Sequence, residues 1–169
     1  MEEIWELFDE QGNKTEKIAK KGEVIPNGLY HLSGDIWIIN SENKILIQKR
    51  SPNKKLSPNV WAMTGGSVIK GETSLQTIER EAEEELGIKL NVKDAKLVDH
   101  YKTGKVWVDS YLVKQDIDLN NIVMQKEELT DVKWATYEEI EEIFQKNQFI
   151  EARWEAIRDI IKKEIKYED

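Results

Sequence analysis

The sequence has no cysteine and only three prolines among its 169 residues. The lack of cysteine excludes disulfide bonds, thiolate metal ligands and a cysteine nucleophile. No stretch approaches the ~20 apolar residues that a membrane-spanning helix needs. The acidic first residues lack the basic and apolar regions of a signal peptide. We therefore expect a soluble, cytoplasmic protein that does not associate with membranes.

Positive charge is also scarce, because 25 lysines and arginines face 33 aspartates and glutamates, for a net charge of -8. Nucleic-acid polymers require clustered Lys and Arg, so we expect no such partner. An acidic protein can still bind a phosphorylated small molecule when a divalent cation bridges the two. The chain shows no repeat and no linker, and its length suits a single domain over residues 1–169.

Hydrophobic periodicity predicts mostly strands first, then one helix, more strands, and two final helices. We expect an N-terminal β-hairpin at about residues 4–19, a short strand at 60–63 and a C-terminal helix at about 149–165. Two pairs of the predicted strands are separated by short turn segments and should form hairpins. This order favours an α+β sandwich with a mixed sheet over a doubly wound parallel sheet. The hairpin and the helix that contains Trp154 offer apolar surface that would suit a homodimer.

The most informative segment is the helix predicted at residues 73–86. Thr73 and Gln76 have the spacing of a capping box, and Gly87 can end the helix in a left-handed conformation. One face of this helix is apolar and is expected to pack on the sheet: Leu75, Ile78, Ala82 and Leu86. A second face is acidic, with carboxylates at positions i, i+3 and i+4 that repel one another: Glu81, Glu84 and Glu85. On charge alone, a solvated acidic face is the simpler explanation, although Mg²⁺ or Mn²⁺ would bind such oxygens.

The residues around this acidic face follow a longer pattern. Gly66 is followed after five residues by Glu72, and after seven more by Arg80 and Glu81; the pattern then continues with Glu84, Glu85, Gly87 and Ile88. This pattern over residues 66–88 resembles the Nudix box at every fixed position, in the loop–helix–turn context that the motif requires. The resemblance implies a Nudix-type α/β/α sandwich with a mixed β-sheet.

The resemblance also implies a role for each box residue. In Nudix hydrolases the second and third Glu of the cluster ligate the metal, which assigns Glu84 and Glu85 here. The Glu after the Arg, here Glu81, ligates the metal or positions a metal-bound water, and in some members acts as the base. Arg80 would orient these carboxylates without touching substrate.

Two further positions support the metal site by the same resemblance. Glu72 is a supporting acid. The main-chain carbonyl of the preceding glycine, Gly65, often completes the metal shell. The expected cofactor is therefore Mg²⁺ or Mn²⁺.

Residues outside the box give weaker predictions. The stretch from Tyr30 to Trp61 looks like the Nudix branch related to isopentenyl diphosphate isomerase, which implies that Arg50 and Lys54 bind diphosphate. An ordinary basic loop remains the alternative. Glu128 lies where some Nudix enzymes place an extra acid, although a solvated loop explains it more simply.

The predicted function is a divalent-metal-dependent hydrolase that cleaves a diphosphate linkage in a nucleoside diphosphate derivative or a similar small molecule. One alternative is a non-catalytic nucleotide-binding or regulatory Nudix domain, but such domains usually have an eroded box. Another is the isomerase itself, which needs a Cys before the acidic helix. This chain has Ser67 near that position and only His31 where the isomerase has several His ligands.

Overall fold

The computed structural model describes residues 2–166, which contain nine strands and three α-helices. The strands are β1 (Ile4–Phe8), β2 (Lys14–Lys20), β3 (His31–Ile39), β4 (Ile45–Arg50), β5 (Trp61–Ala62), β6 (Thr64–Ser67), β7 (Lys96–Thr103), β8 (Val106–Lys114) and β9 (Leu129–Ala135). The helices are α1 (Ser74–Leu86), α2 (Tyr137–Gln145) and α3 (Glu151–Lys166).

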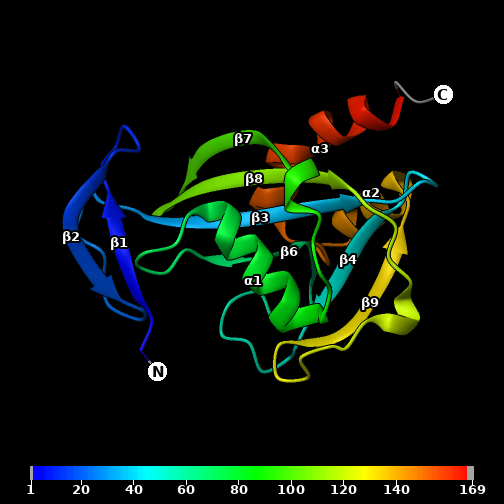
Figure 1. Ribbon diagram of the computed structural model, residues 1–169, viewed down its shortest axis with the longest axis horizontal. Helices are drawn as coiled ribbons and strands as arrows, with labels where there is room; N and C mark the ends of the chain where they lie inside the picture. The colour runs from blue at the N-terminus through cyan, green and yellow to red at the C-terminus, as the bar shows by residue number, and fades with distance from the viewer. Residues whose placement is uncertain (1, 167–169) are drawn as a thin grey trace.

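Seven of these strands form one mixed sheet with the order β5-β4-β3-β8-β7; β6 pairs with β3, and β9 pairs with β4. Only β3 and β8 run parallel, while the other pairs in this sheet are antiparallel. The strands β1 and β2 form a separate antiparallel pair at one end of the molecule (Figure 1). The predicted α+β fold with a mixed sheet is therefore confirmed.

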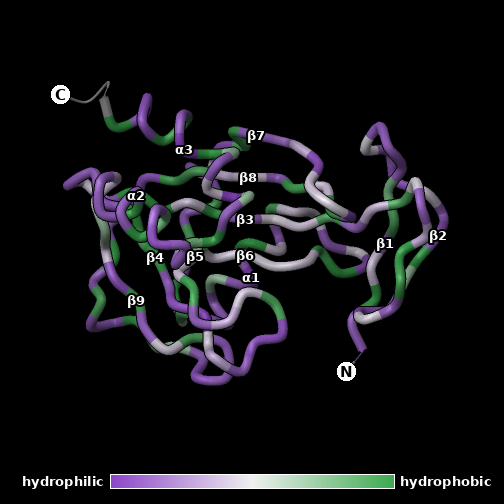
Figure 2. Tube along the Cα trace, turned by 180° about the vertical axis from the view of Figure 1, so that it is seen from behind, coloured by the Kyte–Doolittle hydropathy of each residue, from purple (hydrophilic) through white to green (hydrophobic). Residues whose placement is uncertain are grey.

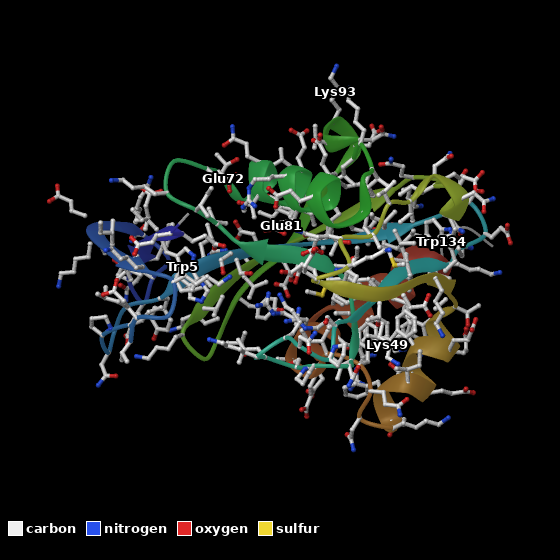
Figure 3. The ribbon with its side chains drawn as sticks, turned by 90° about the horizontal axis from the view of Figure 1, so that it is seen from below. Trp5, Lys49, Glu72, Glu81, Lys93 and Trp134 are labelled. Atoms are coloured by element: carbon white, nitrogen blue, oxygen red, sulfur yellow. The ribbon has the colours of Figure 1, made fainter. Side chains whose placement is uncertain are left out.

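The sheet lies between two helical layers, with α1 on one face and α2 and α3 on the other (Figures 1 and 3). Side chains along β3 alternate between the two faces. Ile36 and Ile38 pack toward α1, whereas Trp37 and Ile39 pack toward α2 and α3. Hydrophobic stretches accordingly follow the central strands, and hydrophilic stretches follow the connecting loops (Figure 2).

Two predicted boundaries differ from the structure. The strand expected at residues 60–63 is the shorter β5, and β6, which was not predicted, follows it. The chain changes partners at Met63, because β5 pairs with β4 whereas β6 pairs with β3. The last helix begins at Glu151, since the backbone just before it extends alongside Trp61. There the Ile150 amide donates to the Trp61 carbonyl at 2.9 Å.

The tryptophan that was expected to support a dimer surface is part of the core. Trp154 is fully buried and contacts Trp37 and Phe149 at the face of the sheet that α3 covers. Its indole therefore offers no surface to a second copy of the chain. Among the described residues, no helix has the length and apolar character required to cross a membrane.

Candidate active site

Helix α1 is fixed at both ends by the features that its sequence predicts. The Thr73 hydroxyl accepts from the Gln76 amide, the Gln76 side chain accepts from the Thr73 amide, and both bonds of the capping box are present. Gly87 adopts a left-handed conformation with φ of 64° at the other end. Between them, the predicted packing face is buried against the sheet, including the fully buried Ile78, Ala82 and Leu86. The orientation of the acidic face follows from this packing.

Arg80 connects three carboxylates of the box. Its guanidinium donates twice to Glu72, through Nε at 2.7 Å and Nη2 at 3.0 Å. Its Nη1 donates to Glu81 at 3.1 Å and to Glu84 at 3.3 Å. The hydrogen bond to Glu72 is the main reason that the pKa of Arg80 is raised. Arg80 therefore contacts three of the carboxylates that it is predicted to orient.

Glu72 braces Arg80 from the loop before the helix. Besides the two bonds from Arg80, it accepts a hydrogen bond from the Thr77 hydroxyl at 2.8 Å. Burial acts to raise the pKa of Glu72, but the bonds from Arg80 and Thr77 outweigh burial, and the pKa is lowered. Glu72 is therefore a charged anchor. Figure 3 shows Glu72 and Glu81 on the side of the sheet that α1 covers.

Glu85 is the buried member of the acidic face, with 8% of its surface exposed. One of its oxygens accepts from the Gln48 amide of β4 at 2.7 Å, and the Gln48 carbonyl in turn accepts from the Thr64 hydroxyl of β6 at 2.9 Å. This chain fixes the carboxyl group between the helix and two strands. Sequence reasoning missed Gln48 and Thr64, and the only signal was a polar residue within each apolar strand.

Two carboxyl groups of the box share a water-poor environment. Burial raises the pKa of Glu85, and the neighbouring Glu81 charge raises it further. Burial also raises the pKa of Glu81 against the opposing effect of hydrogen bonds and of Arg80. A pair of this kind retains a proton unless a cation takes the proton's place. Its chemistry therefore fits a divalent cation, which prefers carboxylate oxygens.

The three predicted metal ligands are only partly assembled. Among the side chains that the structure describes, no three His, Asp or Glu groups are already gathered closely enough to hold a metal ion. Glu81 and Glu85 lie together, whereas the more exposed Glu84 side chain is turned toward Arg80. A metal bound by all three carboxylates would require the Glu84 side chain to turn away from Arg80.

The two box glycines are required by close contacts. A Cβ atom at Gly66 would lie 2.5 Å from Oε1 of Glu81, so glycine leaves the space that the Glu81 carboxylate uses. A Cβ atom at Gly65 would lie 2.5 Å from the carbonyl oxygen of Gly34 in the neighbouring strand. The absence of a side chain at Gly66 therefore makes room for the Glu81 carboxylate, and its absence at Gly65 allows β6 to pair closely with β3.

These groups line a pocket of about 660 Å³, within the range of small-molecule sites. One wall is acidic and comes from α1 and β6. Basic side chains also line the pocket and come from the end of β4 and from the loop after it. The pocket includes the predicted residues Arg50, Lys54, Gly65, Arg80, Glu81, Glu84, Glu85 and Glu128, whereas Glu72 stands behind Arg80.

The predicted diphosphate ligands already have protein partners. Arg50 donates to the carbonyl oxygens of Leu56 and Ser57 at 2.9 to 3.2 Å and so holds the loop 51–59 in shape. The Lys54 ammonium forms an ion pair with Glu128, which comes from the loop before β9. The Ser51 amide donates to the Glu128 carbonyl at 2.9 Å and fixes the two loops side by side.

The fold and the site identify the protein class. The model of the NUDIX domain matches residues 29–163, which is most of the chain. The chain is 38% identical over 151 residues to an uncharacterized Nudix hydrolase of Listeria monocytogenes, with 88% of each chain covered. The chain belongs to the Nudix hydrolase family of enzymes.

Two other similarities have a lower sequence identity. A crystal structure of a Deinococcus radiodurans protein matches with a TM-score of 0.76 at 18% identity, covering 95% of this chain and 98% of that one, which supports the fold alone. An isopentenyl-diphosphate Delta-isomerase of Citrobacter koseri is 33% identical over 85 residues, which cover 50% of this chain and 47% of that protein. This agrees with the branch that the loop residues indicated.

The two glycines give a matched pair of variants. Gly66→Ala should weaken Mg²⁺ or Mn²⁺ binding about 10- to 100-fold, because the new methyl group displaces the Glu81 carboxylate. Stability should change little, since a flexible side chain can move. Gly65→Ala should instead lower the free energy of unfolding by roughly 1–3 kcal/mol, because it meets backbone. Calorimetric metal titration and urea denaturation measure both effects; equal loss of stability in the two variants would contradict this division.

The stability of the metal-free protein should depend on pH through Glu81 and Glu85. Their folded pKa values are raised above the unfolded value of about 4.3, so the folded state holds more protons. The free energy of unfolding should therefore fall as pH rises from 5 to 8. Urea denaturation in EDTA should show this decline, and Glu85→Gln should reduce its slope. The exposed Glu83→Gln is the control, and an unchanged slope in Glu85→Gln would contradict the explanation.

Proposed function

We propose that this chain is a Mg²⁺- or Mn²⁺-dependent hydrolase that cleaves the diphosphate linkage of a nucleoside diphosphate derivative or a similar small X-diphosphate. The observation that carries the proposal is one pocket in which the acidic face of α1 meets the basic loop 51–59. A diphosphate with bridging cations is complementary to both walls. Neither wall alone would suffice. The acidic face of α1 repels a diphosphate in the absence of cations, and the basic loop has no group that could promote hydrolysis.

The carboxylates on the helix would hold the cation. Glu84 and Glu85 are the proposed ligands, with Glu81 as a ligand or as the group that takes a proton from the attacking water, and the Gly65 carbonyl as a further ligand. A bound divalent ion polarises phosphorus and lowers the pKa of water toward neutrality. Arg80 is a positioning residue, because its contacts are to carboxylates and keep Glu81 beside Gly66.

The basic loop would hold the diphosphate. Lys54 lines the pocket and presents three donors. Binding by Arg50 requires its guanidinium to exchange the Leu56 and Ser57 carbonyls for phosphate oxygens. Glu128 is the proposed extra acid. Its charge contributes to raising the pKa of Glu85, so the two groups are close enough to interact.

A panel of substrates tests the reaction. With Mg²⁺, the protein should release phosphate or a monophosphate from at least one nucleoside di- or triphosphate, nucleotide sugar or dinucleotide. Isopentenyl diphosphate tests the isomerase alternative, which we do not favour because Ser67 takes the place of a thiol. Glu84→Gln should lower kcat/KM and metal affinity about 10- to 100-fold or more while the fold remains intact by circular dichroism.

The control for this variant is Glu83→Gln, which removes a neighbouring exposed carboxylate outside the pocket. Tight ligand binding without any turnover would overturn the hydrolase assignment and favour a non-catalytic binding domain. Wild-type turnover by Glu84→Gln would show that the ligand assignment is wrong.

The ion pair between Lys54 and Glu128 gives a separate prediction. In EDTA, Lys54→Met should weaken pyrophosphate binding about tenfold, whereas Glu128→Gln should strengthen it about fivefold by freeing the ammonium, an effect on the order of 1 kcal/mol. In a double-mutant cycle, Glu128→Gln should have little effect once Lys54 is Met. Isothermal titration calorimetry measures all four affinities. An equal effect of Glu128→Gln in both backgrounds would show general charge repulsion instead of competition for Lys54.

A further inference from the structure

The N-terminal hairpin contributes to the pocket although it lies outside the family model. That model begins at residue 29, whereas β1 and β2 end at residue 20. Two residues at the open end of this hairpin, Glu3 and Lys21, nevertheless line the same pocket as Glu81, Glu84 and Glu85. The Nudix domain alone therefore does not account for the whole wall of the pocket.

The hairpin is firmly attached on its pocket side. Trp5 is 8% exposed and stacks on His31 of β3, with ring centroids 4.1 Å apart. The Lys70 amide donates to the Ile4 carbonyl at 2.8 Å, and the Gly71 amide donates to the Glu6 side chain at 3.2 Å. These last two bonds tie β1 to the loop that leads into α1. Figure 3 shows Trp5 within the hairpin, at the end of the sheet.

The far end of the hairpin is attached as well. The Trp107 indole donates to the Asp9 carbonyl at 2.8 Å, and the Phe8 and Tyr30 backbones exchange two hydrogen bonds. The hairpin also has a small core of its own, formed by Trp5, Leu7, Ala19 and Ile25. The hairpin is therefore an ordered part of the pocket wall, and its position relative to α1 is fixed.

The Glu3 carboxylate is held in place by two neighbouring side chains. Its Oε1 accepts from the Trp5 indole at 3.2 Å, and its Oε2 lies 3.5 Å from the Lys21 ammonium. The side chains of Glu3 and Lys21 remain 38% and 64% exposed, so both can contact a molecule in the pocket. Together they offer an acceptor and a donor whose charges largely offset each other.

The charge pattern indicates what this wall binds. A phosphate group belongs with the basic loop 51–59 and would be repelled by Glu3. The pocket volume of about 660 Å³ also leaves room for more than a diphosphate. An uncharged group with hydroxyls suits a carboxylate acceptor beside an ammonium donor, as carboxylates that bind ribose hydroxyls illustrate.

We propose that the N-terminal hairpin is a substrate-specificity element, in which Glu3 and Lys21 hydrogen-bond the hydroxyl groups of a sugar attached to the diphosphate. The inference rests on the proposed function, since it places the diphosphate at the acidic face of α1. It deepens that function by naming sugar-bearing diphosphates as the substrate class.

The test compares Glu3→Ala with wild type on two ligands. One is a nucleoside diphosphate sugar, and the other is an alkyl diphosphate that has no hydroxyl group. Glu3→Ala should raise KM for the sugar compound about tenfold, the usual value of a hydrogen bond to a charged group. It should leave kcat and the KM for the alkyl compound unchanged. The matched control is Glu2→Ala, because Glu2 is the adjacent glutamate, pairs with Lys20 and does not line the pocket.

Binding without turnover separates this inference from the proposed function. Calorimetry with methylene-bridged analogues of both ligands requires no hydrolysis, so a loss of affinity restricted to the sugar analogue would support the hairpin's role even in an inactive protein. An equal effect of Glu3→Ala on both analogues, no effect on either, or no binding of either by the wild type would overturn it. Circular dichroism of Glu3→Ala and Glu2→Ala checks that the hairpin is retained.

Discussion

The site depends on the position of one guanidinium. Arg80 faces the carboxylates of Glu72, Glu81 and Glu84 at once, and without it three negative charges would repel one another on adjacent turns and loops. Glu72 is the firmest of these contacts, with two hydrogen bonds, and it fixes Arg80 to the loop before α1. Arg80 thereby turns a run of acids into a defined arrangement with Glu81 held beside Gly66.

The parts of this arrangement that the sequence predicts are local ones. The capping box at Thr73, the left-handed Gly87 and the buried face of α1 all depend on residues a few positions apart, and each is present in the structure. The mixed sheet was also predicted correctly, because hairpin turns and the order of elements limit the topology. The start of α3 was not predicted correctly, because the Ile150 backbone pairs with Trp61 and the helix begins only after it.

The contacts that the sequence does not predict join residues that are far apart in the chain. Gln48 reaches Glu85 across 37 positions, and Lys54 reaches Glu128 across 74. Neither pair has a spacing that periodicity can detect. The same limit applies to Arg50: the family resemblance implies a diphosphate ligand, and the structure adds that the guanidinium contacts carbonyl oxygens of the following loop. The chemistry of a residue indicates what its side chain can bind, but the fold determines which groups of the protein the side chain contacts.

The pocket therefore has two origins. Its acidic side follows from a short, local pattern on one helix, and this pattern defines the chemistry. Its other sides come from a loop after β4, a loop before β9 and a hairpin at the start of the chain, which meet only when the sheet is complete. Contacts on those sides change the affinity for a substrate without changing the reacting atoms. Changes in the loops and the hairpin can therefore alter which substrate binds while the helix keeps the same chemistry. The hairpin, fixed by Trp5 on His31, precedes residue 29, where the match to the family model begins, and it is the side to which we assign the choice of substrate.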